Sequence, residues 1–251
     1  MPIKMKKLYI ISVLIILSFT NIKAQYSFEF LVSSPVTERI TDFLEEQSGS
    51  FLAVGHEGQV NPVEDTLVGL IIRISVDGDT IVNRFFDADT GYIFQKIVRS
   101  YDNQYYIFGS SVRFPQEQNH NLHIMKLDTG LNIIWEKSYD FGEQWHFPMK
   151  VLSDGEGGFH LISIISKDFK TYSFFCRLDK ECDTIRSKII NEFGANSVRD
   201  AIYSHDSSQL YLFGTGFGSG AGSRVVFDTN YNFIYNTLLP DQASSHMEAM
   251  R

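Results

Sequence analysis

The chain has 251 residues and a formal net charge of −8, from 22 Lys and Arg against 30 Asp and Glu. No basic run or stripe remains after the first 24 residues. A nucleic-acid partner is therefore disfavoured, because affinity for a polyanion needs clustered Lys and Arg.

Residues 1–24 have the pattern of a secretory signal peptide. A lysine-rich start is followed by an apolar stretch over 8–19 that is too short to span a bilayer comfortably, and Ala24 precedes the expected cleavage before Gln25. The sequence thus predicts an exported protein, extracellular, at the cell surface or periplasmic. In the mature chain, 25–251, no stretch is long enough for a membrane span.

A module of about 50 residues is repeated four times after this segment and then begins a fifth time. Each module opens with two apolar stretches around a short polar turn, which predicts a strand, a tight turn and a second strand. The first landmark is a pair of positions that are separated by the same number of residues in every module. The first position is occupied by Phe43, Ile97, Val151 and Ile202, and the second by Gly55, Gly109, Ser163 and Gly214.

A second landmark follows a variable loop in each module. It places a turn of Asp, Asn and Gly between two apolar runs, which is hairpin chemistry. The four copies are Arg73–Ile81, Lys126–Ile134, Arg177–Ile185 and Val226–Ile234. Each module therefore holds four short strands, and stretches such as Phe159–Ile165 are apolar on both faces, as expected for sheets covered on both sides.

These patterns predict an all-β fold, a β-propeller of four-stranded antiparallel blades. Four complete blades are expected at about 38–87, 91–140, 146–191 and 197–241. Residues 26–32 resemble the last strand of a closing blade and 245–251 the first strand of the next one, which gives a partial fifth blade split between the two ends. The missing middle of that blade suggests a truncated chain, and a natural end with a frayed tail is the alternative.

The two cysteines, Cys176 and Cys182, flank the second turn of the third module. An exported protein could oxidise them to a disulfide. If Leu178 pairs with Asp183, however, Cys176 faces Ile185 rather than Cys182. The register does not favour a bridge, and the disulfide stays open at this point. Two cysteines alone do not make a zinc site.

His120 and His123 lie in or near the long loop of the second module. Their spacing could provide half of a metal site on a helix, but no helix is predicted there and no third ligand is visible. Two exposed loop histidines are the favoured interpretation.

Three other motifs have structural explanations that are favoured over functional ones. Asp87–Gly91 resembles the start of a calcium loop, but the following residues supply no further oxygen ligands. Gly216–Gly222 lacks the strand–loop–helix context of a phosphate cradle. Ser75–Thr80 partly resembles the Asp-box turn of sialidase-type propellers. The arginines that sialidase chemistry would use are scattered: Arg73, Arg84, Arg99 and Arg113.

Aromatic residues are abundant, with 21 Phe, 12 Tyr and 2 Trp. Trp145–Phe147 lies in a connection between modules, and Tyr92 and Phe94 occupy the comparable stretch one module earlier. Such side chains could stack on sugar rings or anchor a protein partner. Packing between blades is the favoured role.

The modules resemble the propeller-like repeats of secreted Bacteroidetes proteins. The matching residues of one module are Lys126, Leu127, Asp128, Trp135 and Tyr139, and those of the next turn are Asp154, Gly157, Gly158 and Phe159. Members of that group often carry a C-terminal sorting domain for type IX secretion, which this sequence does not show. A weaker likeness to kelch repeats exists, but three of the four modules lack the Gly-Gly pair.

The sequence therefore favours an exported, non-catalytic binding or surface scaffold protein that presents rim loops to a glycan or a protein. No catalytic residue, cofactor site or metal site can be named from it. The alternatives are a secreted carbohydrate-active enzyme, with acids gathered from separate blades at a central funnel, and a purely structural cell-surface module.

Overall fold

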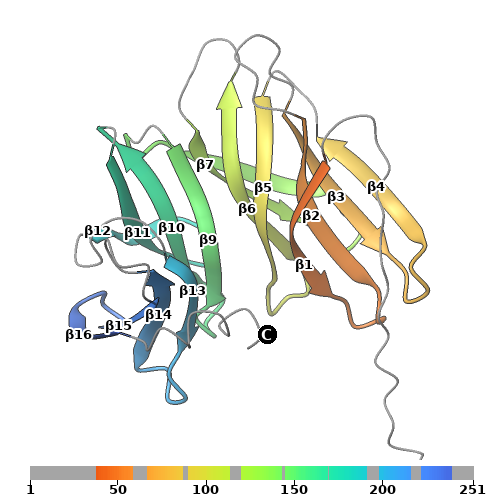
Figure 1. Ribbon diagram of the computed structural model, residues 1–251. Coiled ribbons are helices and arrows are strands. Elements are labelled where there is room, and N and C mark those ends of the chain that lie inside the picture. Colours follow the sequence, from red (N-terminus) through yellow and green to blue (C-terminus); the bar gives the residue numbers. More distant parts are fainter. Residues whose placement is uncertain are drawn as a thin grey trace, which may run out of the picture. The chain divides into compact units, whose positions relative to one another are not determined.

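The computed structural model describes residues 38–58, 67–86, 90–113, 120–142, 145–168, 170–190, 198–215 and 222–238. These residues form 16 strands in four antiparallel sheets and contain no helix (Figure 1). The prediction of an all-β fold is confirmed. The expected signal peptide and the segments 26–32 and 245–251 lie outside the described residues. Within those residues there is also no helix that could cross a membrane.

Each sheet contains four strands that pair in chain order. The first sheet contains β1 (Glu38–Glu45), β2 (Phe51–Glu57), β3 (Val68–Ile74) and β4 (Thr80–Phe86). The second contains β5 (Thr90–Arg99), β6 (Tyr105–Arg113), β7 (Asn121–Leu127) and β8 (Ile133–Tyr139). The third contains β9 (Trp145–Ser153), β10 (Phe159–Lys167), β11 (Lys170–Leu178) and β12 (Thr184–Ile190). The fourth contains β13 (Val198–Tyr203), β14 (Gln209–Thr215), β15 (Gly222–Asp228) and β16 (Phe233–Leu238).

Repeated four-stranded antiparallel sheets of this kind are typical of propeller blades, so the fold is propeller-like. The first strands of successive sheets contact one another: β1 contacts β5, β5 contacts β9, and β9 contacts β13. We call these four the inner strands. They bring side chains from all four repeats to one place.

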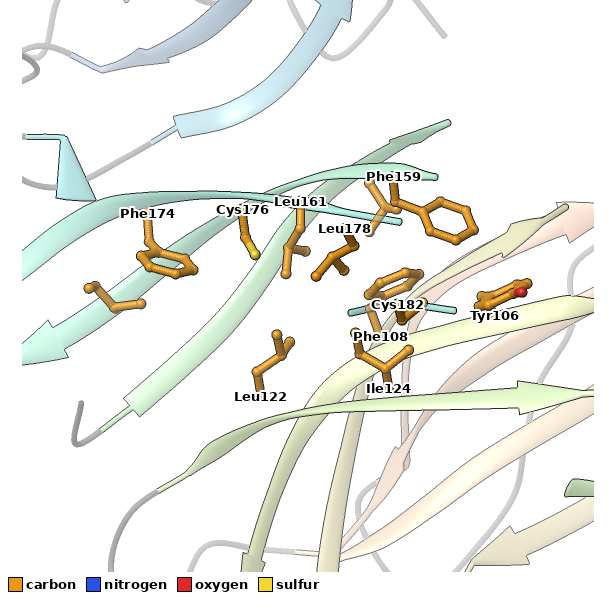
Figure 2. Packing of buried hydrophobic residues seen from close by; sticks show 12 residues of the cluster. Tyr106, Phe108, Leu122, Ile124, Phe159, Leu161, Phe174, Cys176, Leu178 and Cys182 are labelled. Carbon is orange, nitrogen blue, oxygen red and sulfur yellow. The ribbon is translucent and has the colours of Figure 1, made fainter. Parts of the chain in front are cut away.

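The core lies between the faces of successive sheets. Figure 2 shows the cluster between the second and third sheets, where Phe108, Leu122 and Ile124 face Leu161 and Phe174. All five side chains are buried. Because each of these sheets packs against another, its strands are apolar on both faces, which explains the continuous apolar runs of the sequence.

A bulge in each inner strand lies opposite the landmark position, which is occupied by Gly55, Gly109, Ser163 and Gly214. In β1 the register shifts between Ile40 and Asp42, which brings the carbonyl oxygen of Arg39 against the backbone of Gly55. A Cβ atom on Gly55 would lie 1.9 Å from that oxygen, and one on Gly109 would lie 2.3 Å from the carbonyl oxygen of Ile93. Both positions therefore require glycine because of close backbone approach.

The fourth module departs from the predicted alignment. Ala201, not Ile202, takes the position of Phe43, because Ala201 pairs with Leu212 as Phe43 pairs with Ala53. The first turn of this sheet is one residue longer than that of the first sheet. The amide of Ser204 donates a hydrogen bond to the carbonyl of Gln209, whereas in the first sheet the amide of Glu46 donates to the carbonyl of Ser50. Equal spacing in the sequence thus concealed a one-residue shift, which moves a side chain to the other face of a strand.

The turn before the last strand of each sheet contains a residue with positive φ. It is Gly78 in the first sheet and Leu131, Cys182 and Tyr231 in the other three, with φ of 64°, 62° and 63°. These three side chains are fully buried beside residues of the preceding sheet. Such a conformation costs about 1 kcal/mol or more for a non-glycine residue, and burial of the side chain offsets that cost. We call these three residues the plugs.

A cation on the last strand of one sheet bonds to the plug turn of the next. Arg84 of β4 donates to the carbonyl of Leu131, and Lys188 of β12 donates to that of Tyr231. Lys137 of β8, at the same register position, donates to the carbonyl of Glu181, next to the plug Cys182. The three sheet-to-sheet contacts therefore share one mechanism, an inserted side chain and a cation on backbone carbonyls.

If the plugs stabilise the sheet contacts, glycine should have opposite effects on stability at two positions with nearly equal φ. Leu131→Gly should destabilise the protein by about 2 kcal/mol, because the loss of a fully buried leucine outweighs the relieved backbone. Ser207→Gly, at an exposed turn with φ of 57°, should stabilise it by less than about 1 kcal/mol. Urea denaturation measures both, and effects of the same sign would contradict the plug interpretation.

Candidate functional site

A pocket of about 230 Å³ lies among the four inner strands. We call it the inner-strand pocket. Asp42, Lys96, Lys150 and Asp200 hold the same register position, directly after the bulge of each inner strand. The lining is completed by Phe43, Ile97, Val98, Met149, Val151 and Arg199. The fold thus gathers one charged residue from each repeat at a single place, with apolar side chains between them.

The acidic groups of this pocket already have partners. Lys150 Nζ lies 2.7 Å from Asp200 Oδ1, and Asp42 accepts a hydrogen bond of 3.2 Å from the amide of Ile97. Arg199 is exposed and has no ion-pair partner among the described residues. Three cations against two acids leave a local positive balance in a chain whose net charge is −8. The pocket is therefore suited to an anionic group.

One face of β9 continues from this pocket. The exposed or half-buried residues Trp145, Phe147 and Met149 alternate with the buried residues His146 and Pro148. The rings of Trp145 and Phe147 are 5.6 Å apart. Since Met149 lines the pocket, these three side chains form a strip that leads into it. We call it the β9 strip.

The predicted packing role of the aromatics fits most of them. Tyr92, Phe94 and His146 are buried. Trp145 differs, because 47% of its surface is exposed although its ring is held between His120 and Phe147. An exposed tryptophan in fixed orientation can bind a ligand without further ordering.

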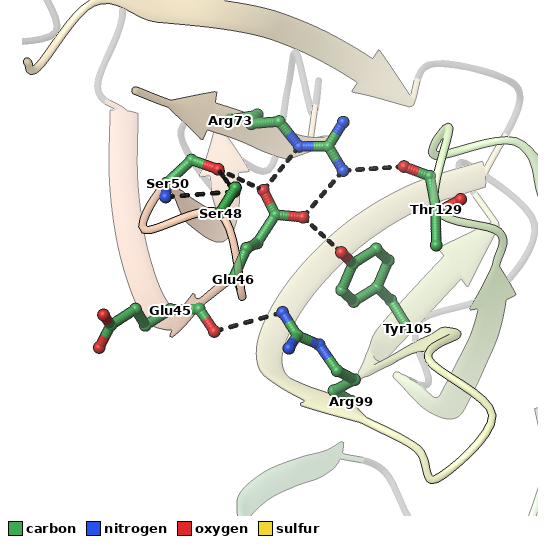
Figure 3. Close-up of polar contacts among 8 residues, drawn as sticks. All are labelled: Glu45, Glu46, Ser48, Ser50, Arg73, Arg99, Tyr105 and Thr129. Carbon is green, nitrogen blue, oxygen red and sulfur yellow. Dashed lines mark hydrogen bonds and ion pairs between the residues drawn. The ribbon is translucent and has the colours of Figure 1, made fainter. Parts of the chain in front are cut away.

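A second pocket, of about 240 Å³, lies beside Glu46. The Glu46 carboxylate is bound by Arg73, through Nε at 2.9 Å and Nη2 at 3.0 Å, and by the hydroxyls of Ser50 and Tyr105 (Figure 3). Arg73 also donates to the carbonyl of Thr129 in the second sheet. Burial raises the pKa of Glu46, but the hydrogen bonds from Tyr105, Ser50 and Arg73 together outweigh this effect and lower it.

This arrangement is a clamp between the first two sheets. Both carboxylate oxygens of Glu46 are engaged by protein groups, which leaves little capacity for a ligand. Comparable pairs join Lys126 to Asp102 in the second sheet and Arg177 to Asp154 in the third. A feature repeated in three sheets is structural rather than specific to a ligand.

The scattered arginines are only partly brought together. Arg73 and Arg99 both lie near Tyr105, with the Arg99 guanidinium 5.8 Å from its ring centre. Arg84 instead bonds to the turn of Leu131. The side chain of Arg113 lies outside the described residues. Because Glu46 occupies Arg73, the described arginines do not form a free carboxylate-binding cluster.

The expectation of two exposed loop histidines is wrong. His123 is part of β7 and His120 directly precedes that strand, and both are buried. The ring of His123 packs 4.9 Å from that of Tyr92, while the ring of His120 packs against Trp145. Among the described residues no group of three His, Cys, Asp or Glu could hold a metal ion. The prediction of exposure failed for these two histidines because burial by a neighbouring sheet leaves no signal in the local sequence.

The cysteines are both buried free thiols. Leu178 pairs with Thr184 and Cys176 with Ser187, so the predicted pairing of Leu178 with Asp183 is wrong by one residue. A bulge in β12 after Thr184 adds a second residue to this offset, so that Cys176 lies opposite Ser187 rather than the predicted Ile185. Burial raises the pKa of each thiol to about 12, which makes both unreactive near neutral pH.

The remaining motifs contribute no ligand site. Ser75–Thr80 forms the plug-type turn of the first sheet, in which the Ser75 hydroxyl accepts bonds from the amides of Asp77 and Asp79. Residues 87–89 of the calcium-like segment and 216–221 of the glycine-rich loop lie outside the described residues.

The chain matches no protein-family model and no curated protein. Among solved structures it is similar to a provisionally assigned exo-beta-1,3-galactanase from Bifidobacterium bifidum s17, at 14% identity and a TM-score of 0.46 over 82% of this chain and 72% of that one. It is similar to the hydrazine synthase of Kuenenia stuttgartiensis, at 11% identity and a TM-score of 0.43 over 86% and 70% of the two chains. A eukaryotic initiation factor is similar at 9% identity, with a TM-score of 0.39, over 80% and 56%. Likeness at this level carries no information on ligand or activity.

We expect the protein to lose stability in mild acid because three of its histidines are buried. Burial lowers the pKa of His123 and His160 to about 4 and that of His146 to about 3. The unfolded chain therefore takes up protons below about pH 6.5, where the folded state does not. Each histidine should cost about 2 kcal/mol of stability between pH 7 and pH 5.

His146→Phe tests this expectation, because the ring lies between Phe141 and Phe174. The variant should lose less stability on acidification than the natural chain in urea unfolding at pH 7 and pH 5. His205→Gln, at an exposed position, is the matched control. Equal pH dependence of all three proteins would contradict the prediction.

The clamp predicts a large effect from a small change. Glu46→Gln should destabilise the protein by about 3 kcal/mol, because it leaves the mostly buried guanidinium of Arg73 without a counter-charge. Tyr105→Phe should cost about 1 kcal/mol, for one hydrogen bond. The control is Glu45→Gln, since only the backbone carbonyl of Glu45 is bonded in Figure 3. Chemical denaturation measures the free energy of unfolding of each variant. If Glu46→Gln is as stable as this control, the clamp does not stabilise the fold.

Proposed function

We propose that this protein is an exported, non-catalytic binding protein that holds an acidic sugar in the inner-strand pocket. The observation that carries the proposal is the chemistry of that pocket, with Lys96, Lys150 and Arg199 beside Phe43 and Met149. A guanidinium without an ion-pair partner among the described residues can bind a carboxylate through two parallel hydrogen bonds. Phe43, 60% exposed, offers an apolar surface to the C–H face of a sugar ring.

Export is supported by the first 24 residues, which combine a basic start, a short apolar stretch and a small residue before Gln25. A position outside the cytoplasm would give the pocket access to glycans. The resemblance to secreted Bacteroidetes repeat proteins agrees with this location.

A closed propeller with a fifth blade is part of the same proposal. At each described contact between successive sheets, a cation of one sheet bonds to the plug turn of the next. The first sheet has Gly78 at the plug position, and the fourth sheet has Thr237 at the cation position. These two sheets therefore lack the groups with which every other described pair is joined. Since these two sheets could not join each other in the way that the described pairs are joined, the proposal includes a further blade between them.

Calorimetric titration with sodium D-glucuronate tests the binding function. The full-length exported protein should bind it saturably, and Arg199→Gln should weaken binding about tenfold or more, because a charge-assisted hydrogen bond contributes about 1.5–3 kcal/mol. Arg186→Gln, an exposed arginine on the outer strand β12, should leave the affinity unchanged. Absence of binding, or equal affinity of both variants, would refute the acidic-sugar pocket.

A second function is favoured by one observation. Asp42 and Asp200 come from non-adjacent sheets and line one pocket, as two carboxylates do in glycoside hydrolases. A secreted carbohydrate-active enzyme would release new reducing ends from acidic oligosaccharides, and Asp42→Asn and Asp200→Asn would each abolish that release. Binding without turnover favours the non-catalytic function.

A further inference from the structure

We propose that the β9 strip extends the inner-strand pocket into an elongated site for an acidic oligosaccharide, with one sugar ring stacked on Trp145. This inference rests on the proposed function, because the pocket would hold the acidic unit of the same ligand. It adds the length of the ligand and a second recognition element.

The geometry of β9 sets the length of the site. Trp145 and Met149 are four residues apart on one strand, which corresponds to about 13 Å at the rise of an extended chain. This distance suits a short oligosaccharide and exceeds a single sugar. Phe147 lies between them on the same face, so the strip offers apolar surface along its length.

The ring of Trp145 is held in place before any ligand arrives. His120 packs 5.2 Å from it on one side, Phe147 packs 5.6 Å from it, and the backbone of Trp145 pairs with that of His120. A preorganised aromatic surface loses little side-chain entropy on binding. The C–H groups of a pyranose form an apolar face that such a surface can cover.

The two ends of the site differ in chemistry. The pocket end carries Lys96, Lys150 and Arg199, whereas the strip consists of Trp145 and Phe147 followed by Met149. A neutral glycan would use the strip alone, and a small organic acid would use the pocket alone. An oligosaccharide with a carboxylate-bearing unit matches both ends, and this complementarity decides among the three ligands.

Tryptophan fluorescence provides a local test, because the chain contains only Trp135 and Trp145. In a Trp135→Phe background of the full-length protein, hexagalacturonate should shift the emission of Trp145, while D-glucuronate should not. Hexagalacturonate should also bind at least about tenfold more tightly than the monosaccharide.

Substitutions separate the strip from the pocket. Trp145→Ala should remove the gain of the hexasaccharide and leave the affinity for D-glucuronate unchanged, and the conservative Trp145→Phe should keep part of the gain. Tyr101→Ala removes an aromatic that is 76% exposed beyond the end of β5, and it should change neither affinity. Thermal unfolding of each variant verifies that it is folded.

The outcomes distinguish this inference from the proposed function. If D-glucuronate binds through Arg199 but the hexasaccharide gains nothing and Trp145 emission stays constant, the elongated site is refuted and the pocket stands. If neutral cellohexaose shifts Trp145 as strongly and Arg199→Gln has no effect, the acidic pocket is refuted and the acidic elongated site with it.

Discussion

Burial of both faces of each sheet is the constraint on which the rest of this structure depends. A strand such as β10 is apolar on both sides and cannot be half solvated, so its sheet needs a neighbour. The plugs Leu131, Cys182 and Tyr231 satisfy this need from a turn and accept positive φ to do so. The same short sequence pattern therefore ends a hairpin and joins two sheets.

Polar groups at the sheet contacts serve two purposes. Arg84 and Lys188 bond to the carbonyls of plug turns, while Arg73 is held by Glu46. These cations are occupied by the protein itself and stabilise the stack. Arg199 lies outside this network, at the bulge of an inner strand, and this position is why we propose a binding role for its charge.

The inner-strand pocket follows from the stack without a motif of its own. Sheets that pack face to face bring their first strands together, and bulges turn the next side chain to one common place. Each repeat then contributes a single residue, which differs from repeat to repeat in charge: Asp42, Lys96, Lys150 and Asp200. A common backbone thus carries charged residues of either sign at one register position.

The sequence by itself determined the four modules, the strand order and the two kinds of turn, because Gly, Asp and Asn act on the local backbone and leave periodic marks. It also indicated Gly55 and Gly109, although the close approach of a neighbouring carbonyl that requires them is visible only in the structure. The tertiary structure alone decided the fate of single side chains. His123 is buried, Trp145 is exposed and Ala201 replaces Ile202, because the covering sheet or a one-residue shift sets each outcome. The pocket could not be predicted for the same reason, since its residues lie about 50 positions apart and meet only after four sheets have stacked.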